Sequence, residues 1–367
     1  MTSASGERAA VVQARRIVVK IGSRAVASDP GAPQRLAREI AEQRGRKRSF
    51  VVVSSGAIAL GFGRLGYRTR PTEMARLQAA AAAGQSVLMR RYDEAFGAVG
   101  LTAAQILLTH ADLADRERVN NAREALAALL EAGAVPIVNE NDTLATDEIR
   151  FGDNDQLAAM VSPLVGAELL VLLTDVEGVL DGRGRRIPVM TADVEVGSVR
   201  STAQRVGSGG MASKLDAAQK ATRSGASVVI APASHENILS ELLSGADVGT
   251  LFPCSGPPLK ARKHWIMFTL RPRGALLLDE GAVRAVRGGK SSLLPVGVLG
   301  VRGQFNPGDA VRLLAPDTSE VGRGLTRLGA LDVARSAGKK GSELEILFGA
   351  GGADLVVVHK DDLVVTA

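Results

Sequence analysis

The first 250 or so residues of the chain alternate short runs of Val, Ile and Leu with longer amphipathic or alanine-rich stretches. Most of the apolar runs are bounded by Gly, Pro, Ser or Asn, and they are residues 17–19, 50–53, 134–138, 169–173 and 227–230. The stretches with helical character are residues 32–46, 72–98, 116–131 and 214–224. Strands and helices that alternate in this way are joined by right-handed crossovers, which place helices on both faces of a largely parallel sheet. The pattern predicts an α/β fold, a three-layer αβα sandwich with a mostly parallel central sheet.

The composition suits such a sandwich. Hydrophobic residues make up 46% of the chain and aromatic residues only 3%, so the core must consist mainly of Ala, Val, Leu and Ile. These side chains pack well in buried parallel strands that are covered by helices. Because 367 residues exceed what one ordinary core holds, we expect two domains.

The character of the sequence changes after Pro257 and Pro258, where a basic, proline-containing stretch leads into short predicted strands separated by glycine turns. The clearest of these strands are residues 274–278, 296–301, 309–314 and 320–325. They predict a small β-rich module with one helix. We therefore divide the chain into a first domain at residues 1–260, a linker at 261–273 and a second domain at 274–367.

Several classes of protein are disfavoured by the sequence. Cys254 is the only cysteine, which excludes an internal disulfide framework and fits a reducing compartment. The start of the chain lacks the apolar core of a signal peptide, and Glu7 argues against a transit peptide. The most apolar stretch, residues 157–173, is interrupted by polar residues, proline and glycine, so it falls short of a membrane span. We expect a cytoplasmic protein that does not associate with membranes.

Neither charge nor histidine spacing indicates nucleic acid or zinc. The net charge is +6, and residues 261–367 hold 15 basic and 11 acidic side chains, a mild excess of 4 that does not by itself support RNA binding. The four histidines share no metal-ligand spacing, and they are His110, His235, His264 and His359. With one isolated cysteine, no zinc site is expected.

Two polar motifs follow the first two predicted strands. Lys20 ends a buried strand and is followed by Gly22 and Ser23. A buried ammonium group is costly without an anion, and glycine lets backbone N–H groups approach a phosphate closely. Ser54, Ser55 and Gly56 lead into a helix and would present hydroxyl and N–H groups to an anion. The alternatives are a strand-end lysine that reaches solvent and a simple helix cap.

The densest polar segment follows the strand that ends at Val138. It contains Asn139, Asn141 and Asp142, and then the cluster Asp153-Asn154-Asp155. So many carboxylates at one strand end repel one another unless cations or hydrogen-bond donors neutralise them. A solvated loop is the alternative, and the spacing does not match the calcium loop of an EF-hand.

Two further motifs follow later strands. Thr174 and Asp175 close the strand at 169–173 and could hold the sugar or base of a nucleotide or cap a helix. The glycine-rich segment 207–214 ends in Lys214 and opens a helix, which is the arrangement of a phosphate loop, although it is neither a Walker A nor a Rossmann sequence. A flexible loop before a helix is the alternative. The chain has only ten lysines, none of them between Lys47 and Lys214, so a lysine beside each glycine turn is more telling than either turn alone.

Two lysines around a negatively charged group suit phosphoryl transfer, in which the protein positions the reactants and neutralises charge. A carboxylate acceptor, with an ordinary pKa of about 4, is ionised at neutral pH and needs no general base. This fits motifs that contain no histidine.

Together the motifs resemble the amino acid kinase family, and within it the branch that phosphorylates glutamate. The residues that carry the resemblance are 19–23, 54–58, 107–109, 115–118, 120–123, 138–142, 151–155, 173–175 and 207–214. The resemblance implies that a catalytic domain transfers a phosphoryl group from ATP, with Mg²⁺, to the side-chain carboxylate of L-glutamate. The product would be L-glutamyl 5-phosphate, in the first step of proline biosynthesis. It also implies glutamyl phosphate reductase as a partner, proline as a feedback inhibitor and a homo-oligomer.

The resemblance implies a role for each motif. Lys20 and Lys214 contact the transferred phosphoryl group, and Asp155 holds their ammonium groups in place. The glutamate-binding positions are Ser55, Asp142 and Asn154, with Asn139 and Asp153 as neighbours. The ATP-binding positions are Lys20, Gly22, Ser23, Thr174, Asp175, Ser208, Gly209, Gly210, Met211, Ala212, Ser213 and Lys214. No metal ligand is assigned.

The second domain resembles a PUA domain, the pseudouridine synthase and archaeosine transglycosylase module, through residues 293–298, 301–305 and 308–311. We expect a β-barrel-like fold there, and a regulatory or structural role rather than RNA binding, because the charge is weak and aromatic residues are scarce. Arg24 and Ser208 depart from the residues common in the family, and residues 181–186 are shorter than its usual insertion.

Two other functions stay open at this point. The nearest is a sister kinase that acts on aspartate, N-acetylglutamate, carbamate or a nucleoside monophosphate. The other is an RNA-binding or RNA-modifying protein, which predicts salt-sensitive RNA affinity without ATP turnover.

Overall fold

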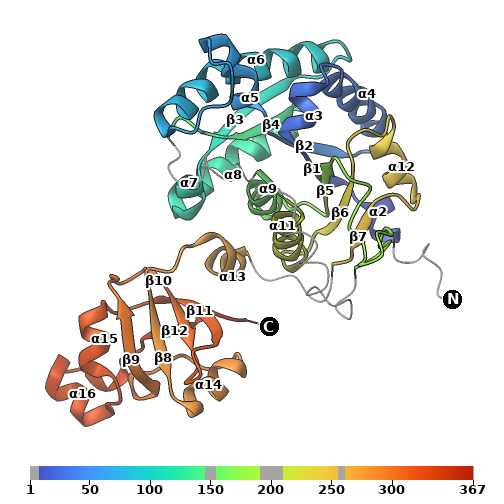
Figure 1. Ribbon diagram of the computed structural model, residues 1–367. Helices are drawn as coiled ribbons and strands as arrows, with labels where there is room; N and C mark the ends of the chain where they lie inside the picture. The colour runs from blue at the N-terminus through green and yellow to red at the C-terminus, as the bar shows by residue number, and fades with distance from the viewer. Residues whose placement is uncertain (1–7, 145–153, 191–209, 255–260, 367) are drawn as a thin grey trace. The chain divides into compact units, whose positions relative to one another are not determined.

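The computed structural model describes residues 8–144, 154–190, 210–254 and 261–366 (Figure 1). The chain folds into two compact units, Met1–Pro258 and Leu259–Ala367. No helix in the described ranges is long and apolar enough to cross a membrane.

The larger unit is built on a seven-stranded sheet in the order β3-β4-β2-β1-β5-β6-β7. Its strands are β1 (Arg16–Ile21), β2 (Ser49–Ser54), β3 (Ala103–Leu108), β4 (Val135–Glu140), β5 (Leu169–Thr174), β6 (Ser227–Pro232) and β7 (Thr250–Phe252). All neighbouring pairs are parallel except β6 and β7, which are antiparallel. The predicted, mostly parallel sheet is confirmed.

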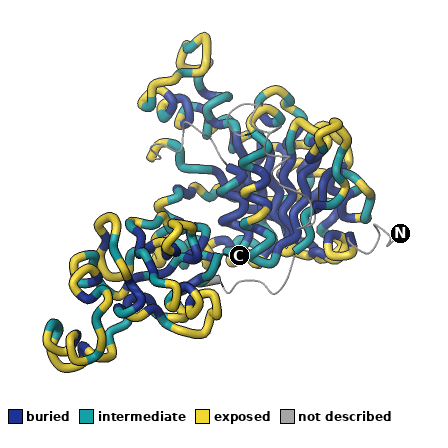
Figure 2. The backbone as a smooth tube through the Cα atoms, turned by 60° about the horizontal axis from the view of Figure 1, so that its bottom comes forward, coloured by how far each residue is buried: buried dark blue, intermediate teal, exposed yellow. Residues whose placement is uncertain are grey.

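Helices cover both faces of this sheet (Figure 1). The helices packed on one face are α2 (Ala9–Gln13), α4 (Ala32–Arg44), α6 (Met74–Gly97) and α12 (Ile238–Ser244). Those on the other face are α7 (His110–Ala114), α8 (Arg116–Glu131), α9 (Asn154–Leu164) and α11 (Met211–Arg223). Short helices follow two strand ends or lie in a connection, namely α3 (Ser23–Ser28), α5 (Ala57–Gly61) and the 3₁₀ turn η1 (Gly63–Leu65). Figure 2 shows the most buried backbone in the sheet between the two helical layers.

Alternation along β1 decides which layer each side chain meets. Ile17 and Val19 belong to the core formed with α4 and α6, whereas Val18 belongs to the core formed with α9 and α11. Successive side chains of a strand point to opposite faces. Lys20 therefore shares the face of Val18 and points toward α9 and α11.

Two strands of the sheet were not predicted. β3 begins with Ala103, Ala104 and Gln105, which are poor strand formers, and as an edge strand it is only partly buried. β7 spans three residues, too few to give a period-2 pattern. Both belong to the sheet through pairing with a neighbour rather than through their own composition.

The smaller unit contains a five-stranded sheet in the order β12-β11-β10-β8-β9. Its strands are β8 (Gly274–Leu278), β9 (Val298–Gly303), β10 (Ala310–Leu314), β11 (Glu320–Thr326) and β12 (Val358–Val365). Leu293, five residues before β9, exchanges backbone hydrogen bonds with Val357 and Val358 at the start of β12. This bridge draws the two edges of the sheet together, as in a barrel.

The prediction of one helix in this module is wrong. The structure has α14 (Glu280–Arg287), α15 (Ala330–Ser336) and α16 (Gly341–Phe348), with 3₁₀ turns η4 (Pro295–Gly297) and η5 (Gly352–Asp354). The two missed helices are only seven and eight residues long, so each offers about two turns of helical periodicity, which is weak evidence in a sequence.

The stretch at 261–273, which we treated as a linker, contains α13 (Ala261–His264) and the π-helix η3 (Trp265–Thr269). Ile266 and Met267 are buried against Val364, and Arg262 forms a 2.6 Å ion pair with Asp362. These contacts place the stretch inside the smaller unit.

Candidate active site

Two buried lysines share one buried carboxylate near the end of β1, the middle strand of the larger sheet. Lys20 Nζ lies 2.8 Å from Asp155 Oδ1, and Lys214 Nζ lies 2.9 Å from Asp155 Oδ2. The lysines are 6% and 7% exposed and the aspartate 1%. The three groups come from the end of β1, the first turn of α9 and the first turn of α11, so residues nearly two hundred positions apart meet at one point.

The charges of this triad do not cancel. Burial would raise the pKa of the Asp155 carboxyl, but the ammonium groups of Lys20 and Lys214 outweigh burial and hold its pKa below the ordinary value. The carboxylate is thus ionised at neutral pH and offsets one of two positive charges. The three groups together carry one net positive charge, which favours an anion beside them, and the Asp175 carboxylate also lies within range of the Lys214 charge.

Gly22, two residues beyond Lys20, has a backbone conformation open to any residue, with φ −75° and ψ 157°. A Cβ added there would meet only the carbonyl oxygen of Leu173, at 3.9 Å. The fold itself therefore does not require glycine at this position. The absence of a side chain leaves backbone N–H groups open to a ligand such as a phosphate.

A chain of side-chain amides lies beside the triad. Asn154 Nδ2 donates to Ser54 O at 2.6 Å, to Ser55 Oγ at 2.9 Å and to Asn139 Oδ1 at 2.9 Å. Asn139 Nδ2 in turn donates to Gln85 Oε1 of α6 at 2.8 Å. Asn139 and Asn154 are both buried, so these two residues of the predicted polar segment are not part of a solvated loop.

Ser55 was open to interpretation as a helix cap. The structure shows no side-chain cap on α5, and Ser55 Oγ accepts from Asn154 instead. Gly56 has φ +114°, a conformation that L side chains rarely adopt, and it turns the chain sharply between β2 and α5. The Ser-Ser-Gly sequence therefore aims a hydroxyl at the amide chain.

A cavity of about 320 Å³ opens next to the amide chain. It is lined by Ala81, Ala82, Gln85, Ser86, Met89, Gln105, Leu107, Glu140, Asn141, Asp142 and Thr143. Burial raises the pKa of the Asp142 carboxyl to about 6, and the positive charge of Arg70 opposes that rise. Asp142 and Gln85 thus face a common space.

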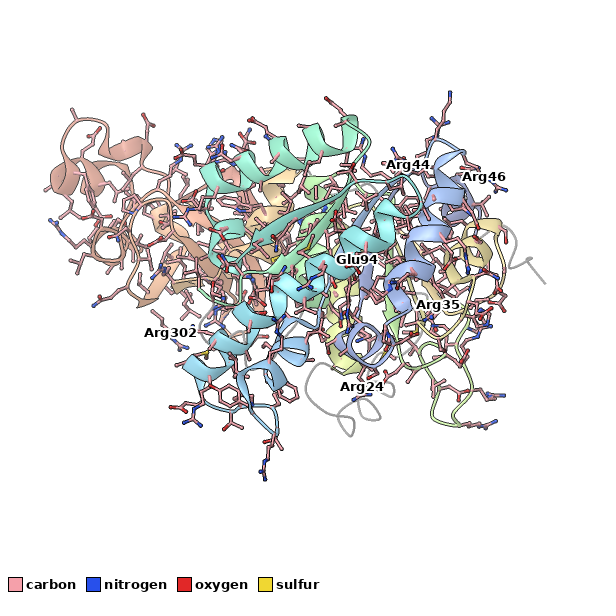
Figure 3. All side chains as sticks on the ribbon, turned by 90° about the horizontal axis from the view of Figure 1, so that it is seen from above. Arg24, Arg35, Arg44, Arg46, Glu94 and Arg302 are labelled. Atoms are coloured by element: carbon pink, nitrogen blue, oxygen red, sulfur yellow. The ribbon has the colours of Figure 1, made fainter. Side chains whose placement is uncertain are left out.

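Asp175 at the end of β5 forms an ion pair with Arg24, and Thr174 Oγ1 donates to Asp175 Oδ1 at 3.2 Å. Figure 3 shows Arg24 at the rim of the unit, in keeping with its exposed side chain. Burial would raise the pKa of Asp175, but hydrogen bonds and the charges of Arg24 and Lys214 hold it below the ordinary value. No helix starts here, so the helix-cap alternative for Thr174 and Asp175 is excluded.

The glycine-rich segment is described only in part. Gly210 precedes α11, and Met211, Ala212 and Ser213 form its first turn with Lys214. Ser208 and Gly209 lie outside the described residues, as does Asp153. In the short stretch at 181–186, Asp181 Oδ1 accepts the backbone N–H groups of Arg183 and Arg185 and closes a tight turn.

Sequence reasoning missed Gln85. It lies in the middle of a 24-residue helix that is rich in alanine. Nothing in the sequence pattern of this helix indicates that Gln85 belongs to a binding site. The one sequence feature that could have indicated it is its spacing: Gln85 is a polar residue on the same face of α6 as Leu88 and Tyr92, whose side chains are buried in the core. Elsewhere in the described ranges, no group of three or more His, Cys, Asp or Glu side chains is arranged to hold a metal ion.

Comparison with known proteins agrees with this fold. Residues 15–232 match the model of the amino acid kinase family, and residues 274–347 match that of the PUA domain. The chain belongs to the amino acid kinase family, with a PUA domain after the catalytic domain.

Its curated relatives point to one member of the family. The chain is 44% identical over 363 residues to a protein of Geobacter sp. (strain M21) named Glutamate 5-kinase, covering 95% of this chain and 97% of that protein. A Glutamate 5-kinase of Thermus thermophilus is 44% identical over 362 residues, with 96% and 97% covered. One from Azoarcus sp. (strain BH72) is 46% identical over 368 residues, with 97% and 99% covered.

Among solved structures, a carbamate kinase of Giardia is similar in fold, with a TM-score of 0.50 and 15% identity over 66% of this chain and 100% of that chain. This likeness supports the fold alone.

Proposed function

We propose that this protein catalyses the ATP-dependent phosphorylation of the side-chain carboxylate of L-glutamate, which yields L-glutamyl 5-phosphate and ADP. The observation that carries the proposal is the buried triad of Lys20, Asp155 and Lys214, which holds an excess positive charge beside an amide-lined cavity. Full-length relatives named Glutamate 5-kinase select glutamate among the carboxylates that such a site could take.

In the proposed reaction, an oxygen of the glutamate side-chain carboxylate attacks the γ-phosphorus of ATP. The bond from that phosphorus to the bridging oxygen breaks, and ADP leaves with the electron pair. Lys20 and Lys214 neutralise charge on the transferred group, and Asp155 fixes the position of both ammonium groups. The acceptor carboxylate is already ionised, so no general base is required.

The remaining site residues divide between the two substrates. Ser55, Asn139, Asp142, Asp153 and Asn154 would bind glutamate. Gly22, Ser23, Thr174, Asp175 and residues 208–214 would bind ATP, which enters with Mg²⁺ as its complex.

The partners follow from the chemistry and from the family. An acyl phosphate is unstable in water, so a glutamyl phosphate reductase is the expected consumer of the product. Proline is the expected feedback inhibitor, a homo-oligomer the expected assembly, and the PUA domain the expected regulatory or structural part.

The test is formation of γ-glutamyl hydroxamate from protein, ATP, Mg²⁺, L-glutamate and hydroxylamine. We expect product with L-glutamate and none with aspartate, N-acetylglutamate or carbamate. Turnover with another acceptor and none with glutamate would overturn the substrate assignment.

The mechanism is tested by Lys214→Met, which removes one positive charge from the triad. We expect kcat to fall by about 10²- to 10³-fold, the usual effect of removing one group that stabilises transition-state charge. Lys220→Met is the matched control, because Lys220 lies on the same helix and contacts Gln156 instead. Equal turnover in the two variants would refute the role of Lys214.

A further inference from the structure

Gln85 has a buried hydrogen-bond donor that finds no acceptor among the described residues. Its Nε2 is inaccessible to solvent and has no acceptor within the described parts of the chain, whereas its Oε1 accepts from Asn139 at 2.8 Å. Leaving a buried donor unpaired costs about 1–3 kcal/mol. Gln85 lines the cavity beside Asp142, so a ligand there could supply the missing acceptor.

The direction of this donor is fixed by its neighbours. The backbone N–H of Glu140 donates to Asn139 at 2.9 Å, and since a backbone N–H can only donate, the atom that receives it must be Oδ1. The other end of Asn139 is therefore the amide nitrogen, which must donate to an oxygen of Gln85. Gln85 accordingly turns Oε1 toward Asn139 and leaves Nε2 as the free donor.

The same chain of hydrogen bonds sets the place of Gln85 along the substrate. Asp155 follows Asn154 in the sequence, Asn154 is bonded to Asn139, and Asn139 to Gln85. Gln85 is thus two hydrogen bonds farther from the lysines than Asn154. If the side-chain carboxylate of glutamate meets the lysines, its amino-acid end extends toward Gln85 and Asp142.

No lysine or arginine is among the described residues that line this cavity, and Asp142 and Glu140 are acidic. An α-carboxylate bound there could accept hydrogen bonds from amides, from backbone N–H groups or from the hydroxyls of Ser86 and Thr143. The positive charge of Arg70 also acts on Asp142. An α-ammonium group would instead be attracted to Asp142. The cavity therefore offers the Gln85 amide as a donor for an α-carboxylate and the Asp142 carboxylate for an α-ammonium group.

We propose that Gln85 is a specificity-determining residue, whose Nε2 donates a hydrogen bond to the α-carboxylate of glutamate while Asp142 faces the α-ammonium group. This assignment rests on the proposed function and adds the recognition of the amino-acid end to it.

The test replaces the donor by an acceptor of the same shape, in Gln85→Glu. The introduced carboxylate would keep an oxygen for Asn139 but repel the α-carboxylate, so we expect the KM for L-glutamate to rise about ten- to a hundredfold, with the KM for ATP unchanged. L-isoglutamine carries an α-carboxamide and a free side-chain carboxylate. Its kcat/KM should fall less than that of glutamate in this variant, because its N–H groups can donate to the introduced carboxylate. The ratio of kcat/KM for glutamate to that for isoglutamine should fall at least about tenfold.

Two further variants keep the result interpretable. Gln85→Met removes the donor without adding charge, and it should raise the KM for glutamate without favouring isoglutamine. Gln34→Glu, at an exposed glutamine of α4, should change neither constant. Thermal stabilisation by glutamate without ATP, measured for each variant, reports binding apart from catalysis.

An unaltered protein that makes no glutamyl hydroxamate would overturn the proposed function. An active protein whose Gln85→Glu and Gln85→Met variants keep the KM for glutamate and the preference over isoglutamine would overturn the role of Gln85 alone. If either Gln85→Glu or Gln85→Met is too unstable to assay, the other one tests the proposal, because both remove the Nε2 donor.

Discussion

Asp155 and Glu39 are both buried carboxyl groups, and their surroundings shift their pKa values in opposite directions. Asp155 touches two ammonium groups, which hold its pKa below the ordinary value. Glu39 in α4 accepts the backbone N–H groups of Leu239 and Ser240, at 2.7 and 3.1 Å, at the start of α12. Burial outweighs these two bonds and raises the pKa of Glu39 to about 7.

Glu39 should make the larger unit less stable as the pH rises. A carboxyl whose pKa is higher in the folded state binds more protons when folded, so its penalty is absent below the unfolded value of about 4.5 and complete above about 7. The full effect is at most about 3 kcal/mol, from 1.36 kcal/mol for each pKa unit. Urea unfolding of the protein at pH 5.5 and pH 8 measures it.

The matched variant is Glu39→Gln, which keeps an oxygen for the two N–H groups and cannot ionise. We expect its free energy of unfolding to change less between the two pH values than that of the unaltered protein. Glu124→Gln, at an exposed position of α8, should leave the difference as it was. The same pH dependence in all three proteins would show that Glu39 does not titrate in this range.

At the scale of elements, the contact between α5 and α6 positions the substrate side of the site. Gly61 and Gly84 let the two helices approach until a Cβ on Gly84 would lie 1.8 Å from Ala57 O. Ser55 and Gly56 immediately precede α5, and Gln85 follows Gly84. The separation of the helices thus sets the position of the Ser55 hydroxyl and of the amide chain.

We expect Gly84→Ala to force these helices apart. Overpacking of this kind typically costs about 1–3 kcal/mol, and the shift should also raise the KM for glutamate more than that for ATP. Gly97→Ala is the control on the same helix, since nothing lies within 4 Å of its Cβ and alanine favours a helix. Thermal unfolding and substrate kinetics of both variants test this prediction. A Gly84→Ala protein as stable and as active as Gly97→Ala would show that close contact between α5 and α6 does not position the site.

At the scale of the whole molecule, each unit has its own core. Ile266 and Met267 are 0% and 4% exposed and form a small buried cluster with Val364, beside the main core of the smaller unit, although they precede its first strand. A domain boundary drawn at residue 274 would remove both side chains from that cluster and expose Val364. Complete burial of one such side chain contributes about 1.5–3 kcal/mol.

We therefore expect residues 259–367 to form a stable fragment and residues 274–367 a much weaker one, by about 3–6 kcal/mol for two buried side chains. Urea unfolding followed by circular dichroism compares the two fragments. Double substitution of Ile266 and Met267 by Ala in the longer fragment should reproduce much of the loss. Equal stability of the two fragments would restore 261–273 as a linker.

Much of the catalytic core could be predicted because its signals are local. The apolar runs at β1, β2, β4, β5 and β6 and the long helices have the periodicity of buried elements, and glycine beside lysine marks a place for an anion. The edge strand β3, the short strand β7 and two short helices of the smaller unit could not be predicted, because their existence depends on neighbours rather than on their own residues.

The sequence by itself determined the order of strands and helices, the two lysines and the acidic and amide residues at the strand ends. Only the tertiary structure decided that Asp155 bridges both lysines and that Ser55 bonds to Asn154 rather than capping α5. It also decided that Gln85 holds a donor with no acceptor in the described parts of the chain. The physical reason is that hydrogen bonds and ion pairs depend on distance and direction in space. Those are set when strands pair in parallel and helices pack across the sheet, and no local pattern in the sequence contains them.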